Sequence, residues 1–443
     1  MKKVYLMVIA AVFSVGMYAQ APQKISLTLQ QAKQIALDYN LTLRNASLDI
    51  RKAQAQRWQT ISSMLPNVTA GYDYRNMMGF TTVFNIPTGM KDPITGEEIV
   101  QRIERKSPPE GNFTILVGAQ INGQQIVGAM LQNIVVEMAD ISKKQTEQTT
   151  TSTATQLYMS ALANQQIVNL LSSSKDNVEK MYNSAQEAVK IGVLEQTEAD
   201  KIYIQVMKIE SGLNSAKQGV ELLFSSLKLH LGFDANTEIV LTDNLDNLTN
   251  AEAALELLYT NFNINDNYNY QLMQQNLKLS KRQIMLAAMG YSPSLTVGYR
   301  FSNIQYFGGE PMMDMNPPNI FTIGISVPLF TSGRVFESIS EKKVDYKKMQ
   351  NTFADTEKQL QIQNKQLRYN LNSAYENFQI QKRNIEVSQR VFNNVSEKFH
   401  YGKASSLEVT QASTDFISAQ NSYIQALVDM TNAQIALRNL LNK

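Results

Sequence analysis

The longest stretch of this 443-residue chain without glycine or proline lies between Gly333 and Gly402. Its apolar side chains recur every seven residues: Leu371, Phe378, Ile385 and Phe392, with Leu367 and Ala374 as a second row. A period near 3.5 predicts a helix that coils against a neighbour along its whole length. Gly402 is expected to end it, and a second helix running to Leu441 would complete an antiparallel hairpin.

The same plan occurs earlier in the chain. A glycine- and proline-free run between Gly128 and Gly192 precedes another helical segment that ends near Leu231. Five residues recur 227 positions later: Asn40, Pro66, Thr69, Gly71 and Tyr72 as Asn267, Pro293, Thr296, Gly298 and Tyr299. Five others recur 210 positions later: Gly192, Glu198, Ala216, Leu227 and Leu231 as Gly402, Glu408, Ala426, Leu437 and Leu441. We therefore expect an internal duplication, with repeats at 20–232 (long hairpin 124–231) and 233–443 (long hairpin 333–441).

Each repeat also contains two segments in which apolar and polar residues alternate. They cover 67–75 and 112–122 in the first repeat, and 294–302 and 320–328 in the second. This pattern predicts strands with one apolar and one polar face. The proline-rich stretch between the first two strands, residues 76–111, is predicted to be a long loop, and 305–319 a shorter one.

The predicted strands have the length that a tilted membrane strand needs. Four strands are too few to close a barrel, and open strand edges are not tolerated in lipid. Several chains would therefore share one barrel, with their hairpins forming a hollow conduit around the same axis. Asp73, Arg75 and Arg300 lie on the polar faces and are expected to face water in the lumen. A small soluble sandwich on a helical stalk is the alternative. The predicted fold class is a mixed α/β membrane protein.

The N-terminus and the composition narrow the function. Residues 1–19 have the two lysines, the short apolar run and the Tyr18-Ala19 site typical of a signal peptide, with a retained anchor as the alternative. The chain has no cysteine and two histidines, which excludes thiol catalysis and leaves little for metal binding. A net charge of +2 provides no electrostatic footprint for nucleic acid. With no phosphate-binding loop either, we expect no enzyme, no cofactor and no metal site.

Several short motifs accompany the duplicated plan. They are the turns from Pro66 into Gly71-Tyr72 and from Pro293 into Gly298-Tyr299, the strand end Pro328-Leu329-Phe330, and Tyr401-Gly402 followed by Leu407-Glu408-Val409. With these motifs the chain resembles the TolC-like outer-membrane factor family of Gram-negative bacteria over essentially all of its mature length. The resemblance implies a homotrimer with a twelve-stranded barrel continued by an α-helical periplasmic tunnel. One departure is Gln120-Ile121-Asn122, which stands where the second repeat has Pro-Leu-Phe.

The resemblance also implies a function and partners. The chain would be the outer-membrane channel of a tripartite efflux or type I secretion system, conducting substrates passively from the periplasm to the exterior. It would contact outer-membrane lipid, a periplasmic adaptor (membrane fusion) protein and an inner-membrane transporter of the RND, ABC or MFS type. The adaptor is expected at the hairpin turns: Gly192, Val193, Tyr401, Gly402 and Lys403. A coiled-coil envelope scaffold without channel activity is the alternative, but it does not account for the strands.

Two acids near the hairpin turns have two readings. Glu198 and Glu408 occupy the same repeat position shortly after Gly192 and Gly402. In a trimer they would form a ring of carboxylates that constricts the pore and selects cations. A glutamate in the first turn of a helix also stabilises that helix by about 0.3–1 kcal/mol through the helix dipole. The sequence leaves both readings open.

Overall fold

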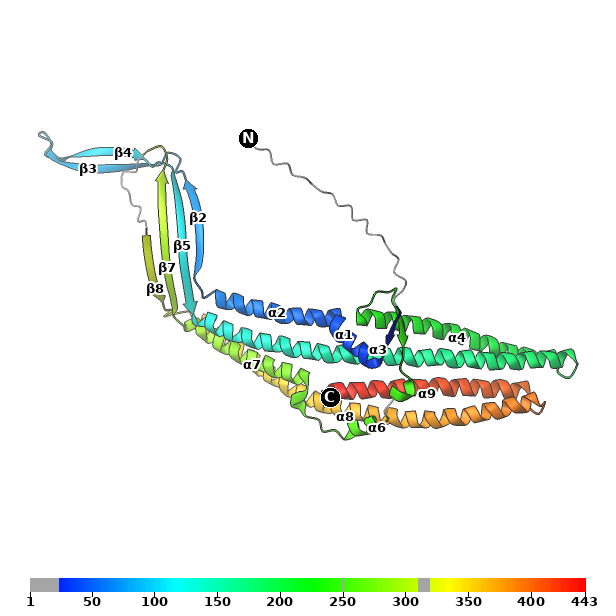
Figure 1. Cartoon of the computed structure of the whole chain (residues 1–443). Coiled ribbons are helices and arrows are strands. Elements are labelled where there is room, and N and C mark those ends of the chain that lie inside the picture. Colours follow the sequence, from blue (N-terminus) through cyan, green and yellow to red (C-terminus); the bar gives the residue numbers. More distant parts are fainter. Residues whose placement is uncertain (1–23, 249–250, 310–318) are drawn as a thin grey trace, which may run out of the picture. The chain divides into compact units, whose positions relative to one another are not determined.

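The computed structural model describes residues 24–248, 251–309 and 319–443 (Figure 1). The predicted signal peptide, 1–19, lies outside the described residues, as does most of the predicted loop at 305–319. The chain forms two compact units. One combines the described part of Met1–Asn45 with Lys144–Asn267 and Leu360–Lys443, and the other combines Ala46–Lys143 with Tyr268–Gln359. Each unit therefore takes residues from both halves of the sequence.

The second unit contains a four-stranded antiparallel sheet with the strand order β2-β5-β7-β8. Its strands are β2 (Asn67–Arg75), β5 (Glu110–Asn122), β7 (Ser294–Tyr306) and β8 (Asn319–Ser326). The helix α2 (Leu41–Ser62) precedes β2, and α7 (Tyr268–Ala288) with a 3₁₀ turn (Met289–Tyr291) precedes β7. Alternating apolar and polar residues form these strands because a strand presents successive side chains to opposite faces. Within the sheet, β2 and β8 each pair on one side only.

The predicted long loop at 76–111 is wrong, because most of it forms a β-hairpin. Its strands are β3 (Thr81–Lys91) and β4 (Glu98–Lys106), paired antiparallel. The prolines that indicated a loop are accommodated: Pro87 lies beside a register shift in a two-stranded ribbon, where proline is tolerated. At the turn, the Asp92 carboxylate accepts hydrogen bonds from the backbone N–H groups of Ile94 and Thr95.

The missing Pro-Leu-Phe motif of the first repeat has a structural reason. β5 lies inside the sheet, so residues 120–122 pair with β7, and Asn122 then caps the next helix directly. The Asn122 side chain accepts from the Gln125 N–H at 2.9 Å, and the Gln125 side chain accepts from the Asn122 N–H at 3.0 Å. In the second repeat Pro328 follows the edge strand β8, where a proline interrupts no ladder.

The helical hairpins contain the longest elements of the chain. The first consists of α3 (Gly123–Lys190) and α4 (Gln196–Leu231), and the second of α8 (Arg334–His400) and α9 (Ser406–Leu441). The remaining elements are the parallel strand pair β1 (Lys24–Leu27) and β6 (Glu238–Leu241), the helices α1 (Leu29–Tyr39), α5 (Leu245–Leu248) and α6 (Ala251–Tyr259), and a 3₁₀ turn (Ile264–Asp266). None of the described helices contains a stretch apolar enough to cross a bilayer.

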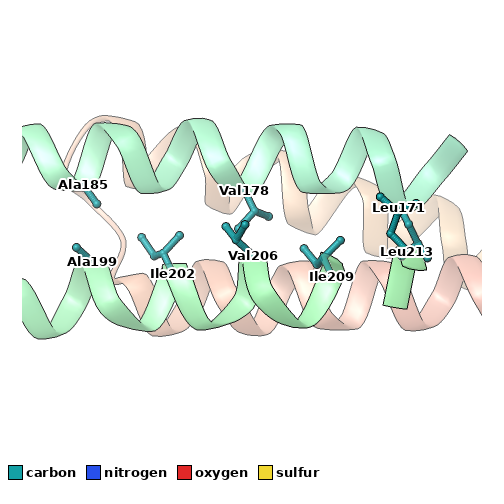
Figure 2. Packing of buried hydrophobic residues seen from close by; sticks show 8 residues of the cluster. All are labelled: Leu171, Val178, Ala185, Ala199, Ile202, Val206, Ile209 and Leu213. Atoms are coloured by element: carbon teal, nitrogen blue, oxygen red, sulfur yellow. The ribbon is translucent and has the colours of Figure 1, made fainter. Parts of the chain in front are cut away.

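The sevenfold pattern faces the interior of the hairpins. In α8, Leu371, Phe378 and Phe392 are buried, whereas Ile385 of the same predicted row is only half-buried. The Phe378 ring lies 5.7 Å from that of Tyr423, and the Phe392 ring stacks at 5.5 Å on that of Phe416. Figure 2 shows the equivalent core of the first hairpin, formed by these residues of α3 and α4: Leu171, Val178, Ala185, Ala199, Ile202, Val206, Ile209 and Leu213. Burying one large aliphatic or aromatic side chain stabilises such a seam by about 1.5–3 kcal/mol.

Two buried asparagines at matching repeat positions tie helix ends together. The Asn40 amide donates to the His230 carbonyl near the end of α4 at 2.9 Å, and its oxygen accepts from the Thr42 N–H at 2.9 Å, capping α2. Asn267, which precedes α7, donates to the Leu440 carbonyl near the end of α9 at 3.1 Å. Each asparagine therefore joins the start of one helix to the root of a hairpin.

Candidate functional site

The two faces of the four-stranded sheet differ in polarity. Directly paired residues of antiparallel strands share a face, so the register defines each face across all four strands. One face is almost entirely apolar: Val68, Ala70, Tyr72 and Tyr74 on β2; Phe113, Ile115, Val117, Ala119 and Ile121 on β5; Leu295, Val297, Tyr299 and Phe301 on β7; Phe321, Ile323 and Ile325 on β8. A continuous apolar face that no described core covers is the surface that lipid would contact.

The opposite face is polar and carries the three predicted lumen residues. Asp73 pairs with Asn112, Arg75 pairs with Glu110, and Arg300 lies between Leu116 and Ile320. The Arg75 guanidinium forms a salt bridge with the Glu110 carboxylate at 3.2 Å. Across the next strand pair, the Ser302 hydroxyl donates to the Asn112 side chain at 2.8 Å. Asp73, Arg75 and Arg300 thus lie on the same face of the sheet.

Aromatic side chains gather at one end of the apolar face. Tyr72 is paired with Phe113, and Tyr299 with Phe321. The Tyr74 ring lies 6.0 Å from that of Phe307. A row of aromatic rings bordering an apolar band is typical of the belt that transmembrane strands place at the membrane–water interface.

The two hairpin turns have the same backbone structure. In the first, Gly192 has a φ of +76°, and the Val193 N–H donates to the Ala188 carbonyl at 2.9 Å. In the second, Gly402 has a φ of +69°, and the Lys403 N–H donates to the Lys398 carbonyl at 2.7 Å. Both are Schellman C-caps, which favour glycine because of the left-handed conformation. The neighbours Val193 and Tyr401 are 75% and 73% exposed, so the turns present apolar side chains to their surroundings.

Glu408 caps its own helix. Its carboxylate accepts the Ser405 N–H at 2.7 Å while the Ser405 hydroxyl accepts the Glu408 N–H at 3.2 Å, which is a complete capping box at the start of α9. These bonds with the Ser405 backbone and side chain lower the pKa of the Glu408 carboxyl. The capping interpretation of Glu408 therefore has a geometric basis within one chain.

Glu198 contacts the other hairpin instead. Its carboxylate forms a salt bridge with Lys201 at 2.6 Å and accepts a hydrogen bond from the Ser406 hydroxyl at the start of α9. Lys201, and secondly Ser406, lower the pKa of the Glu198 carboxyl. The difference from Glu408 is visible in the sequence, because Glu195 occupies the position that Ser405 has in the second repeat. Glu195 forms no side-chain cap, so Glu198 has no capping partner. Sequence reasoning missed Ser406 as a partner.

A groove of about 870 Å³ lies between the two hairpins near their turns. The first hairpin contributes Met181, Ala185 and Val193 to its wall, and the second contributes Phe392 and Phe399. Two of the predicted tip residues, Val193 and Gly402, line this groove. Polar and charged side chains, among them Lys180 and Glu397, also line the groove, so the tip residues border a concave surface of mixed polarity.

The comparisons with known proteins agree with this geometry. Residues 266–443 match the family described as outer membrane efflux protein. CusC has a similar structure, with a TM-score of 0.72 and 14% identity, covering 93% of this chain and 91% of that chain. The Campylobacter jejuni outer membrane channel CmeC has a TM-score of 0.69 and 14% identity, covering 93% of this chain and 85% of that chain. For the Vibrio cholerae outer membrane protein VceC the TM-score is 0.69 and the identity 12%, covering 93% of this chain and 95% of that chain.

No curated protein sequence matches the chain significantly. At this low identity the solved structures show the fold, and they confirm the predicted mixed α/β fold class. The family model matches residues 266–443 of the chain. The chain has the fold of solved outer-membrane channels, and its residues 266–443 match the outer membrane efflux protein family.

Proposed function

We propose that three copies of the chain close one barrel in the outer membrane. The observation that supports this most strongly is the four-stranded sheet with one apolar face, one polar face and two edges, on β2 and β8, that pair on one side only within the described chain. Unpaired edges are not tolerated in lipid, and four strands do not close a barrel. Joining β2 of one copy to β8 of the next satisfies both edges, and Asp73, Arg75 and Arg300 then face the lumen.

In this proposal the long hairpins continue the barrel as a periplasmic tunnel. Each repeat, 20–232 and 233–443, contributes one hairpin and two strands, and the matched asparagines Asn40 and Asn267 support this duplication. Glu198 and Glu408 lie near the hairpin turns and constrict the pore. Glu198 also holds the two hairpins of one chain together through Ser406, so opening the constriction requires this hydrogen bond to break.

The partners are proposed at the hairpin turns. Gly192, Val193, Tyr401, Gly402 and Lys403 contact a periplasmic adaptor, which links the channel to an inner-membrane transporter of the RND, ABC or MFS type. The exposed apolar side chains of Val193 and Tyr401 and the adjoining groove support this site. Val193→Glu and Lys403→Glu should abolish export while trimers remain in the membrane. Normal export by both variants would place the adaptor elsewhere.

Residues 77–111, which include the β3–β4 hairpin, and residues 305–319 are proposed to lie outside the cell. The first segment connects β2 to β5 and the second connects β7 to β8, both at the end of the sheet that carries the aromatic side chains. The helices that precede β2 and β7 and follow β5 and β8 join the strands at the opposite end. Epitope tags in both segments should be reached by antibodies on intact cells. Tags that are hidden in both segments would reverse this topology.

Planar-bilayer recording tests the channel. The purified protein should run as an SDS-resistant trimer until it is heated, and it should insert discrete conducting units into a bilayer. A coiled-coil scaffold would give neither result. The proposal would be contradicted if folded protein, with helix and strand in its circular dichroism spectrum, ran as a monomer in SDS without heating and gave no conductance.

A further inference from the structure

A small cavity lies where the β3–β4 hairpin joins the four-stranded sheet. Its volume is about 160 Å³. Its lining comes from two adjacent ladders: Arg75, Glu110 and Tyr306 form the last rung of the sheet, and Thr82 and Arg105 form a rung at the base of the hairpin. All of these residues belong to one compact unit. The backbone pairing therefore positions the lining side chains.

Positive charge predominates in this cavity. Three cations, Arg75, Arg105 and Lys106, line it together with a single carboxylate, that of Glu110. Glu110 is engaged by Arg75 at 3.2 Å. Among the residues that the structure describes, no carboxylate forms a salt bridge with Arg105 or Lys106. Arg105 shares its face of the hairpin with Thr82 and Phe84, which also line the cavity. An anion in the cavity would supply the counter-ion that no described carboxylate provides to Arg105.

The available donors fit one class of ligand. A guanidinium presents a planar fork of N–H groups and an ammonium presents three donors, and neither group accepts a hydrogen bond. This combination matches the oxygens of a phosphate or a carboxylate, with which arginine forms paired, charge-assisted bonds. The volume admits one such group rather than a whole solute. We propose that this cavity binds the phosphate or carboxylate group of an anion, with Arg105 as its principal donor and Lys106 as a second cation at its edge.

The position of the cavity indicates where the anion comes from. Arg75, Glu110 and Tyr306 lie on the polar face of the sheet, which the proposed function makes the lumen wall. On that basis, which rests on the proposed function, the site lies at the channel mouth and meets anionic solutes as they leave. Phosphates of lipid headgroups in the outer leaflet have the same chemistry and are the second source.

Inorganic phosphate is the probe for the first experiment, with the purified full-length protein in detergent. Arg105→Gln with Lys106→Gln should raise the Kd for phosphate by about tenfold or more, because charge-assisted hydrogen bonds are lost. The matched control is Lys91→Gln with Arg102→Gln, which removes two charges from the same hairpin. Arg102 is paired with Glu104 at 2.7 Å, and neither control residue lines the cavity. The control should bind phosphate as the native chain does.

The result that would overturn the proposal is equal phosphate affinity in the native chain and the Arg105→Gln, Lys106→Gln variant, or no binding by either. Lipid nanodiscs then distinguish the sources. If phosphate binding is abolished in lipopolysaccharide nanodiscs but not in phosphatidylcholine nanodiscs, the site is assigned to lipid headgroups. If phosphate binding is unchanged in both kinds of nanodisc, the site is assigned to soluble anions. Heat-modifiable trimers and conductance, measured on the same preparations, show separately whether the channel proposal holds.

Discussion

Replacing Asn40 with alanine should loosen the root of the first hairpin. The Asn40 side chain is buried and connects three backbone groups of two helices: it donates to the His230 carbonyl and accepts from the N–H groups of Thr42 and Leu43. Alanine removes all three bonds and provides no replacement. We therefore expect α2 to lose its N-cap and the end of α4 to lose its attachment at the same time.

The magnitude follows from the contacts. Losing an asparagine N-cap costs about 1 kcal/mol. Leaving the part-buried His230 carbonyl without its donor costs about 1–3 kcal/mol. The opening of this region should therefore become easier by about 2–4 kcal/mol, which is roughly 30-fold to 10³-fold in the opening equilibrium.

Hydrogen exchange measures this directly, because the amides of Thr42 and Leu43 are protected by the bonds that the mutation removes. Their exchange should accelerate in Asn40→Ala, while amides next to Asn267 in the second repeat keep their native rates. Asn267→Ala should show the reverse pattern, since Asn267 holds the Leu440 carbonyl. Asn263→Ala is the exposed control, because its side chain caps only a short 3₁₀ turn. Unchanged exchange at Thr42 and Leu43 would refute the reasoning.

Three further outcomes are expected. Glu198→Gln with Glu408→Gln should increase single-channel conductance and weaken block by divalent cations. Wild-type traces would leave Glu408 with its role in the capping box and Glu198 with its contacts to Lys201 and Ser406. Lys201 and Ser406 lower the pKa of Glu198, so the bond from Glu198 to the second hairpin is fully formed above the usual glutamate pKa and is lost as the pH falls through the lowered pKa. The conductance of the native channel should therefore change only in that acidic range. A change in conductance near neutral pH would contradict this assignment. Leu371→Ala, at a fully buried position, should destabilise the second hairpin by about 2–5 kcal/mol, seen as faster proteolysis of that hairpin and not of the first.

The repetitive parts of the fold were predictable from the sequence. The sevenfold spacing of Leu371, Phe378 and Phe392 predicted a packed seam, and these side chains are buried. Alternation predicted the two faces of the sheet, because a strand has a strict period of two. Such signals are strong because many residues repeat the same constraint. The β3–β4 hairpin lacked a regular signal, since Pro87 lies within one of its strands and both of its faces mix apolar and charged residues.

The contacts of the acids show where sequence reasoning reaches its limit. A helix-terminus role was one of the two sequence-based interpretations of Glu408, and the capping box with Ser405 gives that role its geometry. The hydrogen bond from Ser406 to Glu198 joins residues far apart in the chain, and only packing of the two hairpins brings them together. The cavity with Arg75, Arg105 and Lys106 likewise depends on the register of two ladders, which no local pattern specifies.

Cross-linking between the edge strands tests the central claim, that the sheet is one third of a closed barrel. The chain has no cysteine, so every thiol can be introduced by design. A series of cysteine pairs should be walked along β2 and β8, starting from Thr69→Cys with Thr322→Cys, and treated with a short bis-maleimide in membranes. Closure through β2 and β8 predicts covalent dimers and trimers in the double variants and no cross-linked species in the single variants. Cross-links between like strands, or none along the whole series in folded protein, would contradict the shared barrel.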